Sequence, residues 1–168
     1  MPTDMIYCKE TTENHHLSLS NKDCLRSLNR MMSKEYKNKS CSVFDSSWIV
    51  LDLDAVEIKK AQKEGNRNRN ATCDCTAGVK KSNAPKMLLI ECRLNYDSVN
   101  GITEGDLDSK VRGSIALMGQ DPAILNQVYF VFKDKVQPQA FRKLRAMKSN
   151  RKEYIAVTIN GLKDSISA

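Results

Sequence analysis

The segment 86–96 (KMLLIECRLNY) constrains the fold most, because it carries the strongest strand signal in the chain. Its apolar run 87–90 is unbroken, which is typical of a strand in the middle of a sheet. Turn-forming residues at 80–85 precede it, and a polar loop at 95–101 follows it. We therefore expect residues 86–95 to form a central strand that pairs with the preceding strand-like segment, 71–79.

Three other segments combine apolar residues at helical spacing with residues that start or end helices. The predicted helices are 21–36, with Ser20 or Asn21 as its cap; 104–118, with Thr103 as its cap and Gly119 at its end; and about 138–148, with Pro138 in its first turn. On the last of these helices, we expect Phe141, Leu144 and Met147 to face the core.

Three more segments, 48–53, 127–132 and 154–159, are rich in β-branched and aromatic residues and predict strands. Segment 55–64 fits either an extension of the first of them or a short helix. The order of elements indicates an α/β protein with a mixed central sheet flanked by helices. A length of 168 residues fits one domain. We expect residues 1–20 to be an irregular N-terminal segment and residues 21–168 to form the single α/β domain.

Positive charge is concentrated near the C-terminal end of the sequence. Residues 133–152 contain eight Lys or Arg and one Asp, an excess equal to the net charge of the whole chain, +7. Such a stretch attracts phosphate backbones or an acidic protein surface; alternatively, it is a solvated helix face. On the first interpretation, the nucleic-acid-binding residues are those on the predicted basic helix: Arg142, Lys143, Arg145 and Lys148.

Two features bear on where the protein is found and on its thiols. No apolar run approaches the length of a membrane span, and residues 1–16 lack the apolar core of a signal peptide, so we expect a cytoplasmic protein without a membrane partner. The six cysteines are then expected to be reduced. Cys73, Cys75 and Cys92 should gather on the core side of the predicted hairpin. Their C-x-C spacing is unlike that of common zinc sites, so we expect buried thiols and no zinc.

Charged residues on the two central strands form the constellation with the clearest chemistry. Asp74 lies in the first strand, and Glu91 and Arg93 lie in the second with their side chains on one face. If the strands pair, two carboxylates meet and can hold a hard cation such as Mg²⁺. A neighbouring cation stabilises charge on a phosphate oxygen. The alternative is an ordinary charged alternation on a half-buried sheet.

This pattern resembles the PD-(D/E)XK nuclease-like superfamily, in which an Asp on one strand is followed by Glu-x-Lys on the next strand, then a helix and further strands. Here Asp74 precedes Glu91-Cys92-Arg93, and the resemblance spans about 48–160. It implies a restriction-endonuclease-like core and a Mg²⁺-dependent DNA phosphodiesterase, or an inactive relative of one. The residues implied as catalytic are Asp74, Glu91, Arg93 and Lys110, and those implied as metal ligands are Asp74, Glu91 and Glu57.

Arg93 departs from the family pattern, because arginine binds phosphate but cannot act as a general base. The resemblance implies that Lys110 on the following helix can supply the missing lysine, and that either Glu57 or Asp54 supplies a further acid, with Glu57 preferred. The departure also favours an alternative function, a non-enzymatic protein that uses its basic helix to bind nucleic acid or an acidic protein. Nucleotide-binding and serine-hydrolase motifs are absent from the sequence.

Overall fold

The computed structural model describes residues 4–37, 39–66, 68–147 and 152–167. At its centre, β4 (Cys75–Lys81) and β5 (Ala84–Arg93) form an antiparallel hairpin. Ser82 and Asn83 both have positive φ, as a tight two-residue hairpin turn requires. The prediction of a central hairpin is confirmed, although β4 begins at Cys75 and not at residue 71.

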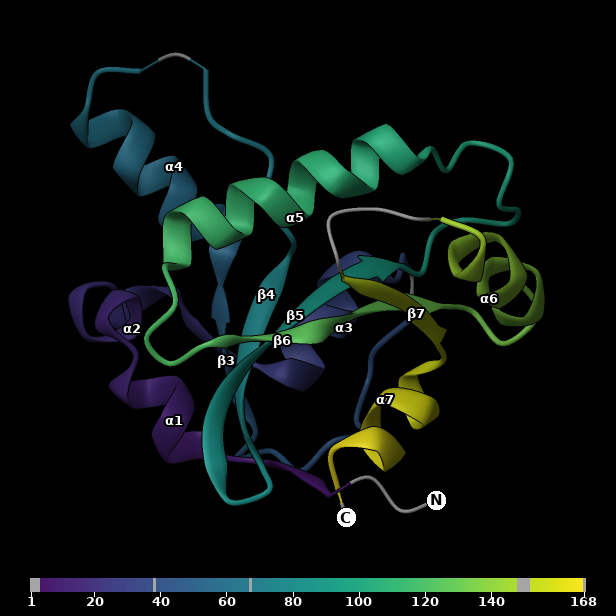
Figure 1. Cartoon of the computed structure of the whole chain (residues 1–168), viewed down its shortest axis with the longest axis horizontal. Coiled ribbons are helices and arrows are strands. Elements are labelled where there is room, and N and C mark those ends of the chain that lie inside the picture. The colour runs from purple at the N-terminus through teal and green to yellow at the C-terminus, as the bar shows by residue number, and fades with distance from the viewer. Residues whose placement is uncertain (1–3, 38, 67, 148–151, 168) are drawn as a thin grey trace.

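The hairpin lies within a seven-stranded mixed sheet, counted over the described residues (Figure 1). The other strands are β1 (Met5–Tyr7), β2 (Leu25–Ser27), β3 (Ile49–Asp52), β6 (Ile124–Phe132) and β7 (Glu153–Val157). The strand order is β2-β3-β4-β5-β6-β7, with β1 paired to β4. β5, β6 and β7 are parallel, whereas the pairs β2–β3, β3–β4 and β4–β5 are antiparallel.

Helices cover both faces of this sheet, which confirms the predicted α/β class (Figure 1). On one face lie α4 (Leu53–Lys63), α5 (Glu104–Met118) and α6 (Gln137–Arg145). On the other face lie α3 (Leu28–Glu35) and α7 (Ile159–Ser165). Alternate residues of β5 enter the two cores, so Leu89 packs under α5 and Ile90 packs on the α3 side.

The prediction of an irregular N-terminal segment is wrong for residues 5–20. These residues form β1, α1 (Lys9–Asn14) and α2 (His16–Ser20). Gly78 on β4 allows this segment to dock. Its N–H donates to the Thr12 hydroxyl, and its carbonyl accepts from the Cys8 N–H. A Cβ at Gly78 would lie 2.4 Å from the Thr12 nitrogen. The short polar segment is therefore ordered by contacts with a strand distant in sequence, which local patterns do not reveal.

Other predicted elements differ from the structure or are decided by it. The helix predicted at 21–36 begins only at Leu28, where Ser27 is its cap, because residues 22–27 form the 3-10 helix η1 (Lys22–Cys24) and β2. The undecided segment 55–64 is helical, with Asp52 as its N-cap. The last strand ends at Val157, and Thr158 then caps α7, which the sequence did not predict. By contrast, α5 begins and ends as predicted, with Thr103 and Gly119 as its caps.

The cysteines do not gather as expected. Cys73 packs in the core beneath α4, α5 and α6, whereas Cys75 and Cys92 pack in the core on the α3 side. The reason is that the strand starts only at Cys75, so alternation does not extend back to Cys73. All six sulfurs are unbridged, and burial raises the pKa of Cys73, Cys75 and Cys92. Such thiols are poor nucleophiles.

No helix in the described residues is long and apolar enough to cross a membrane.

His15 is buried between α1 and α2, with 1% of its surface exposed. Its Nδ1 accepts the Leu17 N–H, and its ring stacks on that of His16. Burial, reinforced by the charge of His16, lowers the pKa of His15 to about 4. The folded protein therefore holds this imidazole neutral at pH values where the unfolded chain protonates it.

We expect His15 to make the fold acid-sensitive. Because its folded pKa lies below its usual 6.5, the unfolded state binds more protons as pH falls, and stability is lost from about pH 6.5 downwards. Between neutral pH and pH 5.5 the loss should be about 1 kcal/mol. The change His15→Asn keeps an acceptor for Leu17 and removes the titration. Urea unfolding at both pH values should show this loss in the wild type relative to the variant; equal pH dependence in both proteins would contradict it.

Candidate functional site

Asp74 reaches Glu91 because β4 separates from β5 at this point. Backbone pairing of the two strands stops at Cys75 and Ile90, and the Asp74 Oδ2 accepts the next N–H, that of Cys92, at 2.6 Å. The Asp74 side chain thus takes the place of a backbone carbonyl in the hydrogen-bond ladder between β4 and β5, and this bond fixes it beside β5. The charge of Asp74 raises the pKa of Glu91, which places the two carboxyl groups near each other. The two carboxylates that the sequence predicted to meet therefore do lie together.

Glu91 points toward α5, on the same side of the sheet as Arg93. Its side chain is 3% exposed, and its Oε2 has no hydrogen-bond partner. The Arg93 Nε lies 3.8 Å from the Glu91 Oε1, while an Arg93 Nη donates to the Tyr96 hydroxyl. Arg93 is therefore held between Glu91 and the loop that follows β5. A buried carboxylate oxygen without a partner usually has a specific explanation, such as an ion that completes the site.

Lys110 projects from α5 into the same site. Its Nζ lies 3.1 Å from the Glu91 Oε1 and 3.5 Å from the Thr72 carbonyl oxygen. The side chain is about a quarter exposed, so the ammonium lies at the boundary between core and solvent. The structure thus brings together Asp74, Glu91, Arg93 and Lys110, which come from three separate segments.

The approach of α5 to the strand depends on two small residues, one turn beyond Lys110. The Ser114 hydroxyl accepts the Cys73 N–H at 2.8 Å and donates to the Lys110 carbonyl. Gly113 lies against the backbone of Ala71, whose carbonyl oxygen would be only 1.8 Å from a Cβ at this position. These contacts set the distance between Lys110 and the carboxylates.

Burial dominates the electrostatics of the site. It raises the pKa of Glu91 well above 4.5, and the charge of Asp74 adds to this effect. Burial also raises the pKa of Asp74, although the Cys92 N–H opposes it. For Lys110, burial acts to lower the pKa, but the charges of Glu91 and Asp74 outweigh it and the pKa is raised. The pKa of each carboxyl is therefore raised even though the Lys110 ammonium lies beside the pair.

The preferred additional acid, Glu57, does not join this site. Glu57 is buried on α4, but its Oε1 accepts the N–H of Asn70, so it fixes the loop before Thr72. Asp54, the alternative acid, lies nearer to the site: its Oδ1 accepts the Thr72 hydroxyl, and its charge raises the pKa of Asp74. The two acids are three positions apart on α4, and they bond different residues of the segment before β4: Glu57 bonds Asn70, and Asp54 bonds Thr72.

Glu35 is a further acid near the site that the sequence did not indicate. It is the last residue of α3, and its pKa is raised by burial and by the charge of Asp74. No local motif marks it, because its proximity to Asp74 arises only when α3 packs against the sheet.

The donor set of the site suits a hard cation. Asp74 and Glu91 offer carboxylate oxygens, one of which is buried and lacks a partner. Mg²⁺ is typically held by one or two carboxylates together with water and substrate phosphate. Within the described residues, no three or more His, Cys, Asp and Glu side chains are grouped as a cation site.

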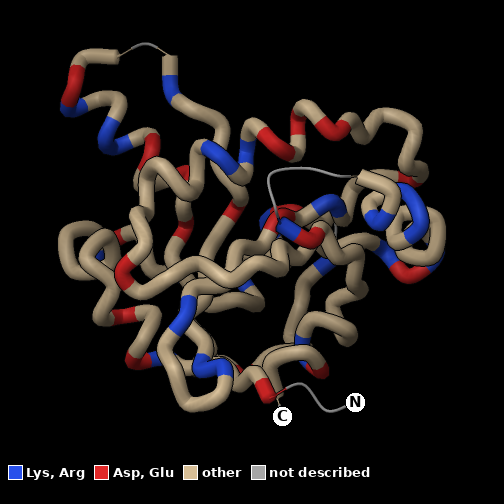
Figure 2. The backbone as a smooth tube through the Cα atoms, viewed as in Figure 1, with Lys and Arg blue, Asp and Glu red and all other residues tan. Residues whose placement is uncertain are grey.

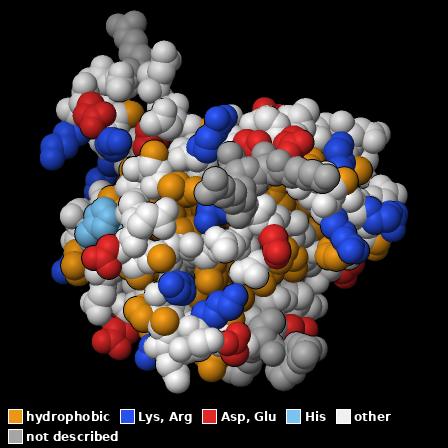
Figure 3. Space-filling model, in the orientation of Figure 1, with side chains coloured by type: hydrophobic (Ala, Val, Ile, Leu, Met, Phe, Trp, Pro, Cys, Tyr) orange, Lys and Arg blue, Asp and Glu red, His pale blue; other side chains and the backbone are white. Residues whose placement is uncertain are grey.

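The predicted basic helix is α6, at the right of Figure 1. Figure 2 marks the Lys and Arg positions of this helix in blue, and Figure 3 shows Lys and Arg side chains at the same edge of the molecule. Arg142 and Arg145 are exposed, as expected, but Lys143 is half-buried and its Nζ donates to the Val99 carbonyl. Lys148 lies outside the described residues. Phe141, expected to face the core, is 42% exposed, because α6 rests on the sheet through Ala140 and Leu144.

Comparisons with known proteins give no match with a family model, a curated protein or a solved structure.

Proposed function

We propose that this chain is a metal-dependent nucleic-acid phosphodiesterase with a core of the PD-(D/E)XK type. The observation that carries the proposal is the meeting of Asp74, Glu91 and Lys110 at one point, with a buried Glu91 oxygen that has no partner. The order of elements also supports it: the strand bearing Glu91 is followed by α5 and then by β6, which is parallel to β5. These features support the proposal.

Each residue has a role that follows from its position. Asp74 and Glu91 would hold Mg²⁺, which supplies Lewis-acid stabilisation of phosphate charge and activates water. Lys110, rather than Arg93, takes the place of the family lysine, since its ammonium is the one that contacts Glu91 most closely. Arg93, permanently charged and fixed by Tyr96, would bind a phosphate oxygen. Asp54 holds the Thr72 segment in place, because its Oδ1 accepts a hydrogen bond from the Thr72 hydroxyl.

The metal site can be tested without a substrate. A cation that binds only the folded protein at about ten times its dissociation constant adds roughly 1.4 kcal/mol of stability, equivalent to a rise in melting temperature of roughly 3 °C for a domain of this size. We expect this shift with Mg²⁺ or Mn²⁺ in the wild type and its loss in Glu91→Gln. The matched control is Glu57→Gln, an equally buried acid outside the site that should keep the shift.

The pH dependence of this shift has a definite sign. Because burial raises the folded pKa of Glu91, the metal-free fold gains stability from protonation and loses it as pH rises through that pKa. A cation must displace the same proton, so metal stabilisation should grow as pH rises. Differential scanning fluorimetry over a pH series measures both effects. A shift that is absent at every pH, or equal in wild type and Glu91→Gln, would leave the non-enzymatic binding function as the better reading.

A further inference from the structure

A second charged region lies on the α3 side of the sheet, away from the carboxylates. It is a cavity of about 670 Å³ at the carboxyl ends of the parallel strands β5, β6 and β7. Leu94 follows β5, Lys133 follows β6, and Ile159 and Asn160 follow β7. In open α/β sheets, this edge is where ligands commonly bind.

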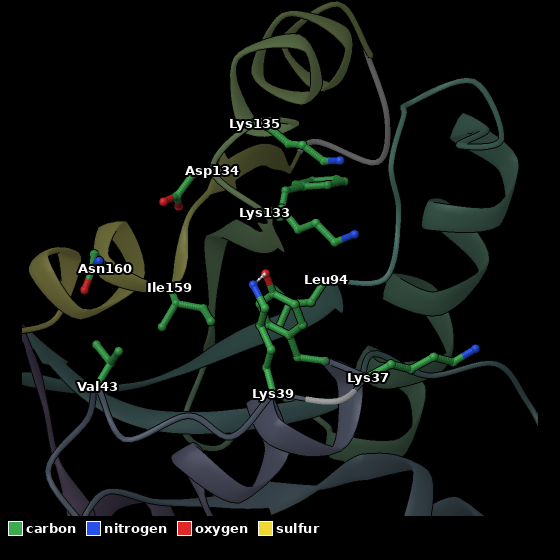
Figure 4. A pocket seen from close by; sticks show the side chains of 11 residues that line it. Lys37, Lys39, Val43, Leu94, Lys133, Asp134, Lys135, Ile159 and Asn160 are labelled. Atoms are coloured by element: carbon green, nitrogen blue, oxygen red, sulfur yellow. Dashed lines mark hydrogen bonds between the residues drawn. The ribbon is translucent and has the colours of Figure 1, made fainter.

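Four lysines give the cavity its character: Lys37, Lys39, Lys133 and Lys135. Figure 4 shows Lys133 and Lys135 extending side by side, with Asp134 pointing away from them. Asp97 pairs with Lys133 at 2.7 Å and with Lys135 at 3.3 Å, but its side chain is 75% exposed. The Lys135 pair is exposed on both sides and is weak, whereas the Lys133 side chain is only 20% exposed. With Asp97 and Asp134 counted, the region keeps a net charge of +2.

The loop between β5 and α5 connects this cavity to the carboxylate site. Tyr96 receives a hydrogen bond from Arg93 of the site. Asn95 accepts the Lys37 N–H at 2.9 Å, and Asp97 pairs with the lysines after β6. Val99 accepts from Lys143 of the basic helix α6. One short loop thus contacts the carboxylate site, the lysines of the cavity and α6.

We propose that this lysine cavity binds the phosphate backbone of duplex DNA. The proposal rests on the proposed function and names the surface that holds its substrate. The four lysines come from two segments, after α3 and after β6. Ammonium groups without base-reading partners favour binding with little sequence preference. Arg142 and Arg145 on α6 are also exposed.

The test measures binding of a short, labelled DNA duplex by fluorescence anisotropy in EDTA, so that cleavage plays no part. The double change Lys133→Gln/Lys135→Gln should lower affinity roughly ten- to hundredfold and reduce the slope of log affinity against log salt by about 2. Lys37→Gln/Lys39→Gln, from a separate segment, should act in the same direction. The matched control is Lys80→Gln/Lys86→Gln, which removes equal charge from the hairpin at the opposite end of β5 and should leave affinity unchanged.

Three results would overturn the inference. Equal losses in the cavity and control variants would mean general charge attraction. Absence of salt-dependent DNA binding in the wild type would also refute it, as would tighter, lysine-dependent binding of poly-glutamate, which would indicate an acidic protein partner. The proposed function is tested by a separate measurement, the rise in melting temperature that Mg²⁺ or Mn²⁺ should cause. If that shift is absent while the cavity variants still lose DNA affinity, only the phosphodiesterase proposal fails.

Discussion

Exchange of Asp74 for asparagine should reduce Mg²⁺-dependent DNA cleavage by roughly a thousandfold, because a metal ion contributes several kcal/mol of transition-state stabilisation. Asparagine keeps a side-chain oxygen that can accept the Cys92 N–H, so the strand geometry should persist. What it loses is the negative charge that the cation requires. Cleavage of a labelled duplex under single-turnover conditions, with Mg²⁺, Mn²⁺ or Ca²⁺, measures the effect, and Ca²⁺ should not support the reaction.

The control for this change is again Glu57→Gln, because Glu57 is buried close by in sequence but bonds Asn70 instead of the site. It should cleave as the wild type does. DNA binding in EDTA should also survive Asp74→Asn, since the lysine cavity is intact. If Asp74→Asn retains full cleavage, the carboxylate pair is not the catalytic site. If the wild type cleaves no DNA with any of these cations, the chain is better described as a binding protein on this fold.

Gly113→Ala should lower the free energy of unfolding by about 2–3 kcal/mol, near the upper end of the usual cost of overpacking. The added Cβ would lie 1.8 Å from the Ala71 carbonyl oxygen, where ordinary contacts begin near 3.4 Å. The carbonyl oxygen is a backbone atom and the Cβ is bonded directly to the backbone, so neither atom can move away by side-chain rotation. Since α5 must move, Lys110 should also retreat from Glu91. Urea denaturation gives the stability, and the metal-dependent melting shift reports the site.

Gly105 provides the comparison, because it lies in the first turn of the same helix and a Cβ there meets nothing within 4 Å. Gly105→Ala should stabilise the protein by roughly 0.5 kcal/mol through the lower entropy of the unfolded chain. A Gly113→Ala protein as stable as Gly105→Ala would show that α5 does not approach Ala71 as closely as described.

Local patterns were sufficient wherever one short segment carried the whole signal. The central hairpin follows from a long apolar run and a turn, and α5 follows from Thr103, its apolar stripe and Gly119. The shared face of Glu91 and Arg93 follows from alternation along one strand. The sequence therefore determined the α/β class and the strand that carries the site.

Tertiary structure decided what depends on contacts between distant segments. The choice of Asp54 over Glu57 depends on how α4 packs against the Thr72 segment. The N-terminal residues are ordered only because β4 offers Gly78 for docking. Glu35 approaches Asp74, and Lys37 approaches Lys133, only after α3 covers the sheet. Such proximity arises from burial of apolar faces, which is non-directional, so no local spacing of charged residues encodes it.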